Sequence, residues 1–181
     1  MGKTVNQNEN QRTPFESVDN FIGVEDGGGA CFVGACLPFG MVKLGPDTPL
    51  PQNTSGYVID KPIDGFSHTH VSGTGGPGKY GNIMVIPQTG NPVLTEYSSN
   101  KSAENARPGY YTVTLHRWNV TAELSANERV GFHRYTYHSA KDALVLFDMS
   151  RAINVVEFAP GHCIRANIRI TSSYEIEGYG I

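Results

Sequence analysis

Two histidines, His68 and His70, stand one residue apart and lead directly into a glycine-rich segment, residues 73–78. Side chains alternate along an extended strand, so we expect both imidazoles on one face, beside Phe66. The glycines permit positive φ angles and let the backbone approach a bound molecule closely. The pattern therefore predicts one wall of a ligand site. The structural alternative is that neighbouring carbonyls satisfy both rings.

A metal-dependent, cupin-like enzyme is another interpretation of the His68-x-His70 spacing. Its ligand set would need a glutamate four or five residues later, and Thr74 and Gly75 occupy those positions. No Cys-x-x-Cys pair occurs either, so a structural zinc site is not expected. We predict no metal ligands in this chain.

The elements that position the histidines are expected to be strands. Apolar and polar residues alternate with period two in four segments, 111–116, 120–125, 130–137 and 164–171. The run 143–147 is apolar throughout, which favours a central strand buried on both faces. No segment has convincing helical periodicity.

Turn signals separate the expected strands. They are Gly45-Pro46-Asp47, Gly90-Asn91-Pro92, Arg107-Pro108-Gly109 and Ala159-Pro160-Gly161. Short strands at regular spacing indicate an all-β fold built from antiparallel sheets, a sandwich or a barrel. Residues 20–90 hold most of the glycines and prolines, so we expect functional loops there and the scaffold in the second half.

Composition excludes several classes of partner. Charged residues make up 17% of the 181 residues and the formal net charge is −3, which argues against a nucleic acid or a membrane surface. No run of 18 apolar residues occurs, so we expect no membrane insertion. The first residues, 1–12, are polar and lack the apolar stretch of a signal peptide. We expect residues 1–14 to be a disordered leader or tag.

A series of motifs, from about residue 15 to the last residue, keeps a specific order. They are Asn20-Phe21-Ile22-Gly23, Leu37-Pro38-Phe39-Gly40-Met41-Val42, Gly45-Pro46-Asp47-Thr48, Gly56-Tyr57, residues 65–75, Tyr80-Gly81-Asn82-Ile83, Pro108-Gly109-Tyr110-Tyr111 and residues 128–135. Together they resemble the N-terminal domain of family 92 glycoside hydrolases, which are exo-acting α-mannosidases.

The resemblance implies a galactose-mutarotase-like antiparallel β-supersandwich over residues 15–181, ending inside or near the close of the sandwich. Its partner would be a larger (α/α)₆ helical catalytic domain of the same polypeptide, which nothing in this chain resembles. The implied activity is calcium-dependent, inverting hydrolysis of terminal α-mannose in glycans. The catalytic carboxylates and the main calcium ligands would come from the helical domain, so we expect no catalytic residue here and no activity from this chain alone. The implied location is secreted, periplasmic or attached to the cell surface.

Six residues match positions in the motif loops of the family and would supply one wall of the mannose pocket: Phe21, Gly23, Phe39, Asp47, His68 and His70. Aromatic faces suit the C–H surface of a sugar, and convergent polar groups suit its hydroxyls. Core packing is the alternative for the two phenylalanines, and a turn is the alternative for Asp47. An alternative function is a stand-alone carbohydrate-binding module without catalysis.

One departure from the family's pattern concerns the glycosidic linkage that is cut. Members that cut α-1,2 linkages tend to carry a tryptophan in the loop before the Gly-Tyr pair, where it packs on the leaving sugar. Here residues 49–55 hold none, and the single tryptophan, Trp118, falls in an expected scaffold strand. The sequence thus leaves the linkage open.

Overall fold

The computed structural model describes residues 12–25, 31–49, 55–71, 80–139, 142–151, 153 and 163–181. Within these ranges every regular element is a strand, and each named strand pair is antiparallel. The all-β class expected from the sequence is confirmed. The described residues contain no helix that is long and apolar enough to cross a membrane.

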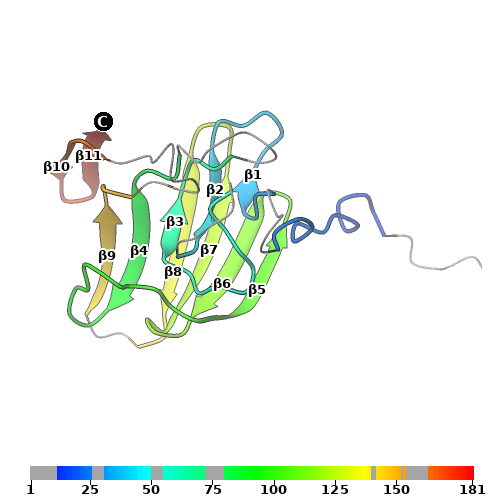
Figure 1. Cartoon of the computed structure of the whole chain (residues 1–181), viewed down its shortest axis with the longest axis horizontal. Coiled ribbons are helices and arrows are strands. Elements are labelled where there is room, and N and C mark those ends of the chain that lie inside the picture. The colour runs from blue at the N-terminus through cyan, green and yellow to red at the C-terminus, as the bar shows by residue number, and fades with distance from the viewer. Residues whose placement is uncertain are drawn as a thin grey trace, which may run out of the picture.

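One sheet has five strands in the order β1-β2-β3-β4-β9 (Figure 1). Its strands are β1 (Ala35–Cys36), β2 (Lys43–Asp47), β3 (Gly65–Ser67), β4 (Met84–Thr89) and β9 (Ala143–Asp148). Four of the five come from the first half of the chain. The glycine-rich half therefore builds most of a sheet, with β-strands that are short because turns interrupt them.

The second sheet has four strands in sequence order. They are β5 (Lys101–Arg107), β6 (Tyr110–Leu115), β7 (Val120–Ala126) and β8 (Gly131–Tyr137). The predicted alternation is confirmed, since buried and half-buried residues alternate along β6 and β7. The turn predicted at Arg107-Pro108-Gly109 joins β5 to β6, and Gly109 has the positive φ of +76° that glycine tolerates.

The hydrophobic core lies between these two sheets. Buried side chains of β6 and β7, such as Val113 and Leu124, belong to one cluster with Leu44, Phe66 and Met84 of the other sheet. Strand β7 also contacts β1 and β2 directly. Fully burying a large apolar side chain contributes about 1.5–3 kcal/mol. Packing of the two sheets therefore holds the loops at their ends in place, and the architecture is a β-sandwich.

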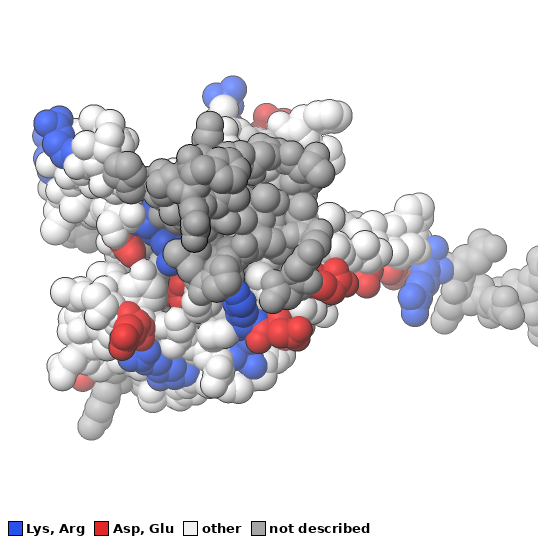
Figure 2. All heavy atoms as spheres, viewed as in Figure 1, with Lys and Arg blue, Asp and Glu red and all other residues white. Residues whose placement is uncertain are grey.

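A third, two-stranded sheet pairs β10 (Ala166–Ser172) with β11 (Glu175–Gly180). Its first strand covers residues 166–171 of the predicted segment 164–171 and ends one residue later, at Ser172. On the face shown in Figure 2, acidic and basic side chains stand next to one another rather than gathering into a field of one sign.

Three expectations about single elements are wrong. Strand β9 is an edge strand of its sheet in the described part of the chain, and Val145 and Phe147 are each 39% exposed. An apolar run alone does not distinguish a central strand from an edge strand whose second face lies open. Trp118 lies in the turn between β6 and β7, not in a strand, and its Nε1 donates to the Tyr97 carbonyl.

The third correction is the predicted turn at Gly45-Pro46-Asp47, which belongs to strand β2. Pro46 lacks an N–H, and the two-residue β1 pairs only with Lys43 and Leu44, so no ladder bond is lost on that side. The turn predicted at residues 159–161 and residues 1–11 of the expected leader lie outside the described residues. Thr13 takes part in a hydrogen-bonded turn with Glu16.

Candidate functional site

The segment that carries the two histidines is held against strand β2. The N–H of Lys43 donates to the His68 carbonyl at 2.8 Å, and the Lys43 carbonyl accepts from Nδ1 of His70 at 2.7 Å. On the other side, the N–H of Gly81 donates to the Thr69 carbonyl at 2.7 Å. Strand β3 ends at Ser67, so the predicted alternation does not reach the histidines. Their positions are set by these hydrogen bonds instead.

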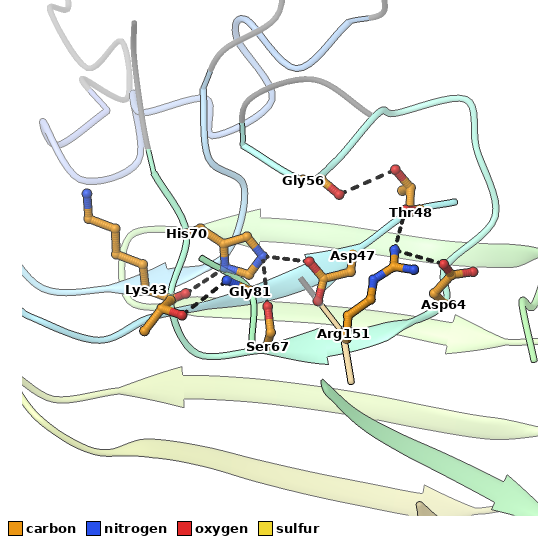
Figure 3. Close-up of polar contacts among 10 residues, drawn as sticks. Lys43, Asp47, Thr48, Gly56, Asp64, Ser67, His70, Gly81 and Arg151 are labelled. Carbon is orange, nitrogen blue, oxygen red and sulfur yellow. Dashed lines mark hydrogen bonds and ion pairs between the residues drawn. The ribbon is translucent and has the colours of Figure 1, made fainter. Parts of the chain in front are cut away.

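His70 is buried and pairs with Asp47 of strand β2 (Figure 3). Its Nε2 lies 3.1 Å from Oδ1 of Asp47 and 3.3 Å from Oγ of Ser67. A carbonyl only accepts, so the bond to Lys43 places a proton on Nδ1. A second proton must then lie between Nε2 and the carboxyl group of Asp47 to make that contact favourable.

This arrangement differs from a Ser-His-Asp nucleophile triad. In a triad the carboxylate accepts from one ring nitrogen and the serine contacts the other. Here Ser67 and Asp47 both contact Nε2, and Nδ1 is occupied by a backbone carbonyl. Nε2 of His70 carries the proton that faces Asp47, so His70 cannot accept a proton from Ser67 as a general base. The cluster is instead a buried anchor for the loop.

His68 has different partners, on the opposite sheet. Its Nε2 lies 3.0 Å from Nε2 of His133 in β8, and Nδ1 of His133 lies 2.7 Å from the hydroxyl of Tyr135. Burial, with the neighbouring His68 ring, lowers the pKa of His133 to about 4. Burial also lowers the pKa of His68, as does His70. Both rings are thus neutral near pH 7, and the Nε2–H of one ring donates a hydrogen bond to the unprotonated Nε2 of the other.

A second ion pair lies beside Asp47. Arg151 donates to Oδ2 of Asp64 and to the Thr48 carbonyl, both at 3.0 Å (Figure 3). Burial raises the pKa of Asp64, while Ser98 and Arg151 oppose that shift. Among the described residues, Oδ2 of Asp47 and Nε of Arg151 are buried without a hydrogen-bond partner. These two atoms are therefore the cluster's remaining acceptor and donor.

The other predicted site residues are found in different settings. Phe21 is half-buried and packs against the core. Gly23 has φ +77°, and a Cβ there would lie 2.7 Å from Sγ of Cys31. Phe39 has φ +61° and is completely exposed, with a relative accessibility of 109%. A bulky residue in the left-handed region is uncommon and costs free energy.

Four of the six predicted residues are thereby linked. His68, His70 and Asp47 form one electrostatic cluster, and Gly23 accepts the backbone bond of Cys31, whose neighbour Phe32 packs on the His70 ring at 4.9 Å. No described contact joins Phe21 or Phe39 to that cluster. Sequence reasoning did not assign site roles to His133, Tyr135 or Arg151. The alternation of β8 could have placed His133 and Tyr135 on the inner face, but only the fold brings them to His68.

Calcium does not fit the described residues. The ion takes six to eight oxygen ligands, usually including several carboxylates. No group of three or more His, Cys, Asp or Glu side chains in the described ranges is arranged to hold a metal ion. The buried carboxylates of Asp47 and Asp64 are already paired with His70 and Arg151.

Comparison with known families decides the chain's affiliation. The sequence model of the glycosyl hydrolase family 92 N-terminal domain matches residues 17–181. The chain belongs to this domain family. The resemblance noted in the motifs is thus confirmed.

Solved family 92 structures share the fold of this N-terminal domain. The α-mannosidase BT3965 from Bacteroides thetaiotaomicron, in complex with mannoimidazole, is 33% identical over 90% of this chain and 22% of its own, with a TM-score of 0.81. The family 92 glycosyl hydrolase ccman5 is 26% identical over 90% of this chain and 23% of its own, with a TM-score of 0.70.

A curated relative is an uncharacterized secreted glycosidase of Arthroderma benhamiae, 31% identical over 135 residues, or 66% of this chain and 17% of that protein. This family 92 N-terminal domain therefore spans only about a fifth of the length of the relatives it matches.

Proposed function

We propose that this chain is the N-terminal domain of a larger exo-acting α-mannosidase that removes terminal α-mannose from glycans. The observation that carries the proposal is the likeness to an α-mannosidase, 33% identical over 90% of the chain at a TM-score of 0.81. The remaining chain would be the helical catalytic domain, and the whole enzyme would be exported from the cytoplasm. The secreted relative supports the last point.

In this proposal the chain helps to bind and position the terminal mannose but supplies no catalytic residue. Inversion needs a carboxylic acid on the leaving oxygen and a carboxylate about 6.5–9.5 Å away that activates water. Asp47 and Asp64 are unsuited to either role because each is buried in an ion pair. In this proposal both catalytic carboxylates, and the main calcium ligands, would lie in the helical domain, as the family resemblance implies.

The exposed Phe39 ring and the half-buried His68 are the candidate sugar contacts that a partner domain could reach. Asp47 and His70 are buried, so we assign them a positioning role beneath His68. Gly23 supports the His70 ring indirectly, because its carbonyl accepts from Cys31 and the neighbouring Phe32 packs on that ring. This part of the pocket wall is preorganised, because its rings are fixed by hydrogen bonds before any sugar arrives.

The test uses the full-length protein and the 181-residue chain side by side. Mannose release from α-1,2-, α-1,3- and α-1,6-mannobiose is measured, and proton NMR follows the anomer that forms first. We expect release of β-mannose by the full-length protein, loss of activity with a calcium chelator, recovery with added calcium, and no release by the short chain. Release of α-mannose first, or no release from any mannobiose, would overturn the proposal.

A further inference from the structure

The outer face of the four-stranded sheet carries a groove that the proposed active site does not use. Its volume is about 380 Å³, within the usual range of small-molecule sites, and its lining residues are Tyr110, Glu123, Leu124, Ser125, Phe132, His133 and Arg134. Leu124 and His133 contribute backbone to the floor, because alternation turns their side chains inward.

The strand registers place the groove's side chains in two rows. Tyr110 lies opposite Ser125, and Ser125 lies opposite Phe132, so the small serine stands between two aromatic residues. In the next row Thr112, Glu123 and Arg134 face one another in the same way. The backbones of Tyr110 and Phe132 are separated by two strand spacings, about 9–10 Å.

That separation suits a saturated six-membered ring. Carbon atoms in contact lie about 3.5–4 Å apart, so a ring held between two aromatic side chains needs about 7–8 Å. Ser125 leaves this space open because its side chain is short. Phe132 is 52% exposed, so its ring surface is available to a ligand.

Hydrogen bonds fix the groove's polar side. Arg134 donates to both oxygens of Glu123, through Nε at 2.6 Å and through its terminal nitrogen at 2.5 Å. The hydroxyl of Tyr110 donates to Oε1 of Glu123 at 2.6 Å, and the guanidinium of Arg107 lies 4.8 Å from the Tyr110 ring centroid. Tyr110 is therefore held from two sides.

The groove's charge is balanced. Hydrogen bonds from Arg134 and Tyr110 lower the pKa of Glu123 to about 2, so it is a carboxylate paired with a guanidinium. A charged ligand would have to compete with this pair. A neutral ligand with paired hydroxyl groups can accept from the guanidinium and donate to the carboxylate, while its C–H faces contact the two rings.

We propose that this groove is an accessory binding site for one pyranose ring of a neutral oligosaccharide, separate from the active site. A site of this kind would hold a glycan on the enzyme's surface and raise its local concentration near the pocket. Mannose is the expected sugar only because of the proposed function. The proposal that the groove binds a pyranose ring depends on the groove's geometry and not on that function.

The test is titration of the 181-residue chain with α-mannobiose and, separately, with cellobiose at tens of millimolar, followed by two-dimensional amide NMR. We expect saturable shifts on β6, β7 and β8, from Tyr110 to Arg134. Phe132→Ala removes one aromatic wall, and Ser125→Gln fills the floor while keeping both rings. Each should weaken binding at least tenfold. The matched control is Tyr174→Ala, which removes an aromatic side chain that is 91% exposed in the β10–β11 turn.

No saturable shift with either sugar would overturn the inference, as would shifts that map elsewhere or that persist in both groove variants. Denaturation midpoints of the variants check folding. In the full-length protein, the groove variants should release mannose from soluble mannobiose at the normal rate. If the unaltered full-length protein hydrolyses no mannobiose but its groove binds sugar, only the proposed function is contradicted. If it hydrolyses mannobiose but its groove binds no sugar, only the accessory site is contradicted.

Discussion

His70 and Asp47 form an ion pair with no exposed side-chain surface, although 23 residues separate them in the chain. The pair joins the end of β3 to β2 and holds the loop that carries His68. Its loss should therefore affect both the stability of the sandwich and the position of the neighbouring imidazole.

Replacing Asp47 by alanine should destabilise the chain by about 3–5 kcal/mol, because it leaves the buried imidazole of His70 without its charge partner. Urea denaturation followed by circular dichroism measures the change. Arg169→Ala is the control, since Arg169 and Glu177 form an exposed pair, with side chains 69% and 58% accessible. That loss should cost about 0–1 kcal/mol. Equal effects of the two substitutions would mean that the buried pair does not anchor the loop.

The His68–His133 pair should make stability depend on pH between about 6.5 and 4. The pKa of His133 is about 4 in the folded chain, below the ordinary 6.5, so the unfolded chain takes up its proton first as the pH falls. The stability is thus complete above pH 6.5 and is lost progressively toward pH 4. Each unit of difference corresponds to about 1.4 kcal/mol, which sets a ceiling of about 3.5 kcal/mol for this group.

His133→Gln checks that assignment, since glutamine can keep a hydrogen bond to His68 but cannot take up the proton. We expect the variant's free energy of unfolding to fall less steeply than that of the original chain between pH 6.5 and 4. His138→Gln is the control, because His138 is exposed and its Nε2 lies 2.8 Å from the Thr121 hydroxyl. Parallel pH profiles for the original chain and His133→Gln would refute the assignment.

Two glycines with nearly the same backbone angle should respond differently to a methyl group. Gly23 and Gly109 have φ of +77° and +76°, but a Cβ at Gly23 would lie 2.7 Å from Sγ of Cys31, whereas one at Gly109 would meet nothing within 4 Å. Gly109→Ala should cost about 1–2 kcal/mol for the left-handed conformation alone. Gly23→Ala should cost more, and adding Cys31→Ala should recover the excess. Equal losses of stability in Gly23→Ala and Gly109→Ala would show that the Cys31 side chain moves away from the added methyl group at no cost.

Phe39 should be replaceable without loss of stability. Its φ of +61° is unfavourable for a bulky residue, and its side chain is fully exposed. Phe39→Gly should therefore leave the free energy of unfolding unchanged or raise it by up to about 1 kcal/mol. In the full-length protein we expect kcat/KM for mannobiose to fall at least tenfold, about 1.4 kcal/mol of transition-state binding.

Leu94→Gly is the matched control for Phe39, because Leu94 is a large apolar residue that is 69% exposed. It should leave kcat/KM unchanged. Unfolding of the chain by Phe39→Gly would contradict the stability prediction. A folded Phe39→Gly variant with unchanged kcat/KM would show that Phe39 has no role in the sugar pocket.

Much of this fold was accessible from local patterns. Alternation along β6, β7 and β8 predicted strands because a half-buried sheet imposes period two on its side chains. The order of the motifs from Asn20 to Tyr135 predicted the family. The order of motifs along the chain can be read from the sequence without knowledge of the fold.

The contacts between the side chains of the site were decided by tertiary structure. Nothing local indicates that His68 meets His133 across the sandwich, 65 residues away, or that His70 pairs with Asp47. The same limit explains the errors at β2 and β9. Whether Gly45-Pro46-Asp47 turns or extends depends on the strands beside it, and whether residues 143–147 are central or at an edge depends on how many strands the sheet has. Sequence determined which side chains were present and which faces they could share, whereas packing between distant strands determined which of them touch.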